Sequence, residues 1–394
     1  MHIFSNGGIK DRLRQYPNRL TAFFCAVLAL ALTGCEQLQY YHQAATGQLQ
    51  LMGSRTPVAR LLADSETDPA LRRQLELAQD ILGFAQQKMG MPHRGKYQSY
   101  VALADRYVVW NVFASPALAF ASPRWCYPIV GCTPYRGFFD KEDAEQFAGD
   151  LGDTGYETYI GGVSAYSTLG WFKDPLLSSF LSYHPADLAE LLFHELAHAQ
   201  IWAPGDAVFN ESLADFVGTE GARQWLLTDG TDGYRKLAVW LKRQQQWEQM
   251  KQRLLELKDR LSEVYGDVSL SDDEKLLRKR DRYAEFRQCY NENRADLGGG
   301  RFDRLVSEGV NNAFLVSLAT YTNWREALQI PWRDAQQDWT SFFASMQLLE
   351  QLPHEKRQQQ LERWQEEARR GVPLARDDQH TDYADDPDAK EVQC

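Results

Sequence analysis

The sequence predicts an α+β protein that is predominantly helical, with a small antiparallel sheet and a long helical hairpin. Most of the chain repeats apolar residues at steps of three and four, which is the spacing of one helix face. The stretch from about 97 to 170 is instead rich in aromatic and β-branched residues with frequent Gly and Pro, which is typical of short strands and tight loops. A charged block over 234–293 keeps leucines at helical steps around one turn-like break, which predicts two antiparallel helices.

The composition is that of a folded globular protein. Of the 394 residues, 44% are hydrophobic and 25% are charged, so there is ample material for a core. The net charge of -11 argues against a nucleic-acid partner, which would require clustered Lys and Arg. The basic residues of block 234–293 are interleaved with Glu and Asp, which predicts a solvated face rather than a nucleic-acid arm. A protein partner at this hairpin remains an alternative.

The N-terminus reads as a targeting segment over residues 1–34. Basic residues precede an apolar run from Leu20 to Leu32 that is too short to span a bilayer comfortably. The run ends in Thr33, Gly34 and Cys35, which resembles the lipobox of bacterial lipoproteins and implies a lipid on Cys35. A single apolar anchoring helix is the alternative, and both place the body outside the cytoplasm. The Glu after this Cys resembles the sorting pattern of outer-membrane lipoproteins, which implies an anchor facing the periplasm.

The remaining elements are expected in one domain over residues 35–370. A helical lead-in comes first, with Ser65 or Asp68 available to cap its second helix. After the sheet region, two helices follow between Ala186 and Trp225, and then the hairpin and further helices up to about residue 370. The tail over 371–394 is acidic and nearly free of apolar residues, so we expect it to be disordered.

The cysteines suit an oxidising compartment. Cys126 and Cys132 are six residues apart in a segment with Pro and Gly, so a short loop could join them in a disulfide. A zinc site there is the weaker alternative, because the neighbourhood supplies no further ligands. The pairing of Cys289 and Cys394 stays open.

The segment LLFHELAHAQIW carries the strongest chemical signal. His194 and His198 are four residues apart in a helical run, so one turn places both imidazoles on the same face. Two such imidazoles can bind one zinc ion, and Glu195 lies beside the open coordination position as a general base. A hydrogen-bonded buried His pair would not explain this Glu in an apolar run, because an unpaired buried carboxylate is costly.

A second segment, FNESLADF, supplies the carboxylates that a catalytic zinc site requires. Glu211 and Asp215 are four residues apart at the start of a helix that Asn210 could cap. Glu211 would complete a His, His, Glu set with the fourth position left to water. Asp215 would then accept the other N–H of a metal-bound imidazole.

Together, HELAH and NESLAD resemble the motifs of the gluzincin metallopeptidases. More closely, YVVWNVFASP, WCYPIVGC, YRGFF, GGVSAYSTLGWFKDP and the two motif helices resemble bacterial lipoproteins described as candidate zinc aminopeptidases, over about 97–225. The resemblance implies a zincin-like active-site helix against the sheet, zinc on His194, His198 and Glu211, Glu195 as base and Asp215 behind a histidine. Twelve residues separate His198 from Glu211, which is shorter than in thermolysin, so Asp215 remains an alternative ligand.

Other parts of the site are less defined by sequence. Tyr321 in ATYTNW and Tyr166 in GGVSAYS are candidate donors to the reaction's oxyanion, with simple packing as the alternative for both. GGVSAYS could be an edge strand that pairs with substrate or an ordinary hairpin. Its flanking carboxylates, Glu157 and Asp174, are the nearest candidates to hold a substrate amine.

These observations predict a zinc-dependent peptide hydrolase anchored by lipid in the bacterial envelope. The term aminopeptidase rests on the resemblance, and an endopeptidase of the same mechanism stays open. The rival class is a non-catalytic envelope scaffold with structural zinc, which would have no need of Glu195 as a base.

Overall fold

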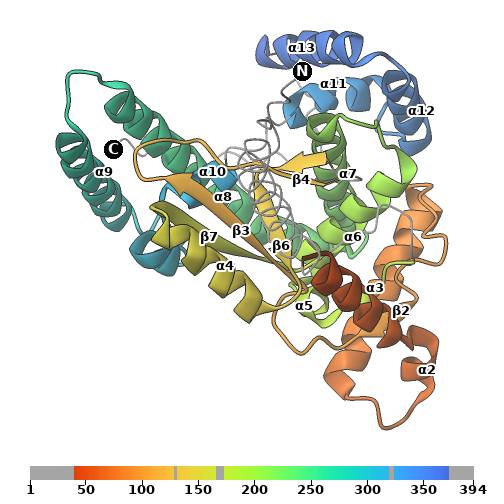
Figure 1. Cartoon of the computed structure of the whole chain (residues 1–394). Coiled ribbons are helices and arrows are strands. Elements are labelled where there is room, and N and C mark those ends of the chain that lie inside the picture. The colour runs from red at the N-terminus through yellow and green to blue at the C-terminus, as the bar shows by residue number, and fades with distance from the viewer. Residues whose placement is uncertain (1–39, 128–130, 166–172, 319–323, 372–394) are drawn as a thin grey trace, which may run out of the picture. The chain divides into compact units, whose positions relative to one another are not determined.

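The computed structural model describes residues 40–371 except 128–130, 166–172 and 319–323 (Figure 1). The chain divides into two compact units, Met1–Ser54 and Arg55–Cys394. The described part of the first unit is a helix over 40–53. The predicted signal peptide, the predicted lipidation site Cys35 and the tail beyond 371 lie outside the described residues. None of the helices within the described ranges has the length and apolar character needed to cross a membrane.

The second unit confirms a predominantly helical α+β fold. Its helices are α2 Val58–Ala63, α3 Pro69–Lys88, α4 Lys141–Asp153, α5 Ser178–Leu181, α6 Pro185–Gln200, α7 Ala207–Leu227, α8 Gly230–Gly266, α9 Asp272–Glu292, η1 Leu305–Gly309, α10 Asn312–Leu318, α11 Arg325–Asp334, α12 Trp339–Glu350 and α13 His354–Arg369. Its strands are β1 Thr56–Pro57, β2 Ser99–Val101, β3 Val109–Pro116, β4 Trp125–Tyr127, β5 Gly131–Thr133, β6 Tyr135–Phe138, β7 Tyr156–Val163 and β8 Leu176–Leu177.

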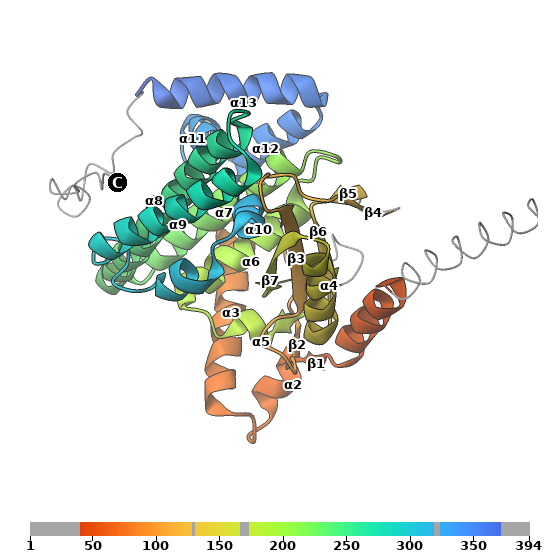
Figure 2. The ribbon, with the colours of Figure 1, turned by 60° about the vertical axis from the view of Figure 1, so that its left-hand side comes forward.

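The main sheet is antiparallel, with strand order β6-β3-β7. Successive side chains of a strand point to opposite faces, so Trp110 and Phe113 of β3 serve different faces. Phe138, the β6 partner of Trp110, packs on Phe147 of α4 with ring centroids 5.3 Å apart. On the other face, Tyr159 pairs with Phe113 in register and contacts Phe314 of α10 at 5.0 Å. The sheet is therefore enclosed by α4 and α10 (Figure 2).

Helix α4 corrects the expectation that the whole stretch from 97 to 170 forms strands and loops. Asp140 caps this helix by accepting from the Asp143 N–H at 3.0 Å, and acidic residues occupy the first turn. Both are ordinary helix-start signals, but they lie between aromatic segments that do form strands. The second sheet, β1-β2-β8, is mixed, because β1 and β2 run antiparallel whereas β2 and β8 run parallel.

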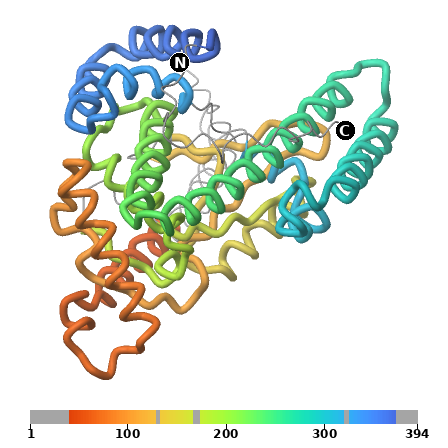
Figure 3. Tube along the Cα trace, turned by 180° about the vertical axis from the view of Figure 1, so that it is seen from behind, coloured from red at the N-terminus to blue at the C-terminus, as the bar shows by residue number. Residues whose placement is uncertain are grey.

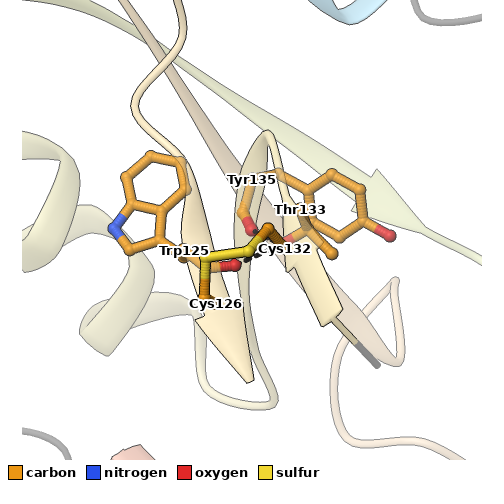
Figure 4. Close-up of a disulfide and its surroundings, with 5 residues drawn as sticks. All are labelled: Trp125, Cys126, Cys132, Thr133 and Tyr135. Carbon is orange, nitrogen blue, oxygen red and sulfur yellow. Dashed lines mark hydrogen bonds between the residues drawn. A yellow bond between two sulfur atoms is a disulfide. The ribbon is translucent and has the colours of Figure 1, made fainter. Parts of the chain in front are cut away.

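A separate hairpin of β4 and β5 carries a disulfide between Cys126 and Cys132 (Figure 4). The two cysteines face each other in register, and the neighbouring Thr133 hydroxyl donates to the Tyr135 carbonyl at 2.6 Å. The structure thus places in one short hairpin the two cysteines that the spacing suggests as a pair.

The long hairpin is formed by α8 and α9, which run side by side as predicted for residues 234–293 (Figure 3). Leu254, Leu257 and Leu261 of α8 are buried against Phe286 and Tyr290 of α9. A capping box at Ser271 and Glu274 begins α9, which explains the sharp turn after α8.

Candidate metal centre and active site

Helix α6 carries the two histidines on one face because its other face is apolar. Leu192, Phe193 and Leu196 are buried in the core, which leaves His194 and His198 on the side toward α7. Their rings are edge-to-face with centroids 4.8 Å apart, and the two Nε2 atoms are 3.1 Å apart. The predicted spacing of one helical turn therefore brings both imidazoles to the same point.

The connection from α6 to α7 is short, and buried polar side chains stabilise it by hydrogen bonds to its backbone. Asp206 caps α7, and its Oδ1 accepts from the Phe209 N–H at 3.1 Å. The expectation that Asn210 caps this helix is wrong, since α7 begins at Ala207. Asn210 instead lies in the first turn, where its amide bonds the N–H and the carbonyl of Ala203 at 2.8 and 2.9 Å. These bonds fix the orientation of the turn that carries Glu211.

The carboxylate of Glu211 lies close to the imidazole rings of both histidines. Its carboxylate oxygens lie 3.5 Å from His194 Nε2 and 3.7 Å from His198 Nε2. Among the described residues, these three side chains form a group that could hold a metal ion. Tetrahedral zinc with ligands at about 2.1 Å requires ligand atoms about 3.4 Å apart, so the observed spacings fit zinc. The donor set also matches, because two imidazoles and one carboxylate suit a catalytic zinc site with an open position.

Gly218 of α7, which the sequence reading did not single out, allows the two motif helices to approach closely. A Cβ at this position would lie 2.7 Å from the Glu190 carbonyl oxygen and 3.2 Å from His194 Cβ, both on α6. Only a residue without a side chain fits such an approach without displacing a backbone. The separation of the histidines from Glu211 is therefore set partly by this glycine, which lies about two turns beyond Glu211 on α7.

Asp215 contacts the ring nitrogen of His194 that does not face Glu211. Its Oδ1 lies 3.0 Å from His194 Nδ1, so the ring donates this N–H and turns Nε2 toward Glu211. The alternative role of Asp215 as a direct ligand is not favoured by this geometry. Although burial lowers the pKa of His194, hydrogen bonds to Asp215 and Glu211 raise it to about 10. Burial and the neighbouring His194 charge lower the pKa of His198 to about 4.

Glu195 is half-buried beside the three side chains that could hold the metal, and its Oε2 atom is buried. Its Oε2 has no hydrogen-bond partner among the described residues, which is costly for a carboxylate unless another group or water joins it. Burial raises the pKa of Glu195, with His194 acting in the opposite direction. A carboxylate with a raised pKa and an unpaired oxygen is suited to accept a proton from water.

A buried ion pair that sequence reasoning missed belongs to the same surroundings. Lys96 Nζ lies 3.0 Å from Asp174 Oδ2, and the two side chains are 9% and 3% exposed. The Lys96 charge acts on both Glu195 and His198, so this pair shapes the potential of the site. The backbone on either side of Lys96 has positive φ at two residues that are not glycine, +49° at Arg94 and +60° at Tyr97. Asp174, a candidate to hold a substrate amine, is thus paired with a lysine of the chain itself. The partners are far apart in sequence, and nothing around Lys96 in the sequence marks it as the partner.

The remaining candidates are placed less directly. Glu157 accepts from Lys279 Nζ and from the Asn312 N–H at 2.8 Å, so it links β7 to α9 and α10. Gly162 lies on β7, an edge strand, but an added Cβ there would overlap the Tyr107 ring, which is a packing reason for the glycine. Tyr166 and Tyr321 both lie outside the described residues.

Comparison with known proteins supports a peptidase. A family model described as "Putative aminopeptidase" matches residues 39–361. The chain belongs to this family. No curated protein and no solved structure gives a significant match. The family match covers α6, α7 and the hairpin, so the candidate metal centre lies within the matched residues.

Proposed function

We propose that this protein is a zinc-dependent aminopeptidase in which His194, His198 and Glu211 hold the metal. The convergence of these three side chains beside Glu195, whose Oε2 atom is buried, is the observation that carries the proposal. A structural zinc site would fill its fourth position with a protein ligand, whereas the described residues offer three. The aminopeptidase family supports the same reaction class.

The chain's own residues have distinct roles in this proposal. When bound, zinc would supply a Lewis acid for the scissile carbonyl and a water of lowered pKa. Glu195 accepts the proton of the attacking water and later delivers it to the leaving amine. Asp215 keeps His194 in the tautomer whose Nε2 faces the metal position.

Tyr321 and Tyr166 are the proposed donors to the oxyanion of the tetrahedral intermediate. The described neighbour of Tyr321 gives some support, because the Trp324 N–H donates to Ser212 Oγ at 3.0 Å. Ser212 follows Glu211 on α7, so the chain after Tyr321 is attached beside the metal centre. A tyrosine O–H that reached the oxyanion would strengthen its hydrogen bond as charge develops on the oxygen.

The substrate test is a peptide library offered in two forms, with free and with acetylated N-termini. The chain produced from Glu36 onward should remove single N-terminal residues from the free peptides and leave the acetylated ones intact. Internal cleavage of both forms would instead indicate an endopeptidase. Glu195→Gln should reduce the rate by at least about a hundredfold. Absence of cleavage by the unmodified protein, or equal rates for both proteins, would contradict the proposal.

We further propose that a lipid on Cys35 anchors the protein in the bacterial envelope, facing the periplasm. The basic segment, apolar run and lipobox-like ending support this location. The disulfide of the β4–β5 hairpin suits an oxidising compartment. Cys35→Ser should release the protein from the membrane fraction, and unchanged membrane association would count against the anchor.

A further inference from the structure

The first turn of α7 is held by a buried ion pair with the C-terminal helix α13. Asp206 Oδ2 accepts from Arg357 Nε at 2.7 Å, and the two side chains are 9% and 5% exposed. The partners are 151 residues apart in sequence. An ion pair with so little solvent contact is held in one geometry far more firmly than a surface pair.

Asp206 uses its two carboxylate oxygens for different tasks. Oδ1 caps α7 through the Phe209 N–H, while Oδ2 receives the Arg357 guanidinium. The guanidinium also lies over the Phe209 ring, 5.3 Å from its centroid. Glu211 follows Phe209 by two residues, so the contacts from α13 meet the turn that carries this proposed metal ligand.

The guanidinium is itself fixed at its far side. Arg357 Nη1 donates to the carbonyls of Glu350 at 2.7 Å and Leu352 at 3.1 Å, where α12 ends. A planar guanidinium bonded on both sides has little freedom to swing. These bonds therefore fix Asp206, and with it the start of α7, relative to the end of α12 and to α13.

We infer that Arg357 is a positioning residue for the metal centre, acting through Asp206 on Glu211. This inference rests on the proposed zinc function. A zinc ligand must be held to about 0.2 Å, whereas the fold as a whole tolerates larger shifts. Loss of a group that orients a ligand typically weakens metal affinity about 10–100-fold.

A second buried pair provides a matched control. Lys279 on α9 bonds Glu157 on β7, with side chains 9% and 27% exposed. Lys279→Met leaves the half-buried Glu157 carboxylate without its ammonium partner, but α9 and β7 do not form the α6–α7 turn. Lys279→Met should therefore lower stability without moving Glu211.

The experiment measures zinc affinity by competition with a chromophoric chelator, together with thermal unfolding of the metal-free proteins. Arg357→Met should raise the zinc Kd about 10–100-fold. Lys279→Met should change the Kd less than about threefold, although both variants unfold at lower temperature. If Arg357→Met does not fold, the double variant Asp206→Asn/Arg357→Met removes both charges and keeps a capping side chain, and its Kd should still rise at least tenfold.

The outcomes separate the inference from the proposed function. If the unmodified protein binds zinc and the Arg357 variants bind it equally well, the positioning role is wrong while the zinc site stands. Equal weakening by Arg357→Met and Lys279→Met would show that affinity follows stability alone, which also overturns the inference. If the unmodified protein binds no zinc, both the proposed function and the inference fail.

Discussion

Replacing Gly218 by Ala tests whether close approach of α6 and α7 sets the metal geometry. The new Cβ would lie 2.7 Å from the Glu190 carbonyl oxygen, short of the ordinary contact distance of 3.4 Å by about 0.7 Å. The obstructing atom is backbone, so relief requires the helices to separate. Overpacking of this kind costs about 1–3 kcal/mol, and the better helix propensity of Ala returns about 1 kcal/mol. We expect a net loss of about 0–2 kcal/mol in the free energy of unfolding.

The effect on the metal should exceed the effect on the fold. Zinc ligands tolerate shifts of about 0.2 Å, so separating His194 from Glu211 by several tenths of an ångström should weaken zinc binding at least tenfold. Chelator competition gives the Kd, and urea unfolding of the metal-free protein gives the stability. Gly83→Ala is the control, because α3 has open space at Gly83, and it should gain up to about 1 kcal/mol with unchanged Kd. A Gly218→Ala protein with the zinc Kd of the unmodified protein would refute the reasoning.

Three further predictions follow from single contacts. Asp215→Asn removes the carboxylate behind His194, so chelator competition should show zinc affinity about 10–100-fold weaker, and an unchanged Kd would argue against this role. Lys96→Met leaves the buried Asp174 without its ammonium partner, so urea unfolding should show a loss of about 3–5 kcal/mol, largely recovered when Asp174→Asn is added. Replacing Cys126 and Cys132 by Ala removes a short covalent loop and should cost about 2 kcal/mol, whereas unchanged stability would mean that the unfolded hairpin is already constrained.

The features that were predictable from sequence are those with local periodicity. His194 and His198 are one turn apart, and a helix of apolar residues determines where both point. The same rule places Asp215 one turn beyond Glu211. The hairpin of α8 and α9 was predictable because its leucines recur at helical steps and its turn has a capping signal.

The features that sequence reasoning missed depend on contacts between distant segments. Gly218 looks like an ordinary helical glycine until α6 is packed against it. The pairs Lys96–Asp174 and Asp206–Arg357 join segments with no shared motif. The cap of α7 was misplaced because both Asp206 and Asn210 are good capping residues, and only the packed turn shows which one starts the helix.

The most direct test of the account is the zinc content of three purified proteins, measured by native mass spectrometry beside their peptide cleavage. The unmodified protein and Glu195→Gln should each carry one zinc, and His198→Ala should carry none. Only the unmodified protein should cleave, because the other two lack either the base or the metal. An unmodified protein without zinc, or a Glu195→Gln protein that cleaves at the normal rate, would contradict the central claim.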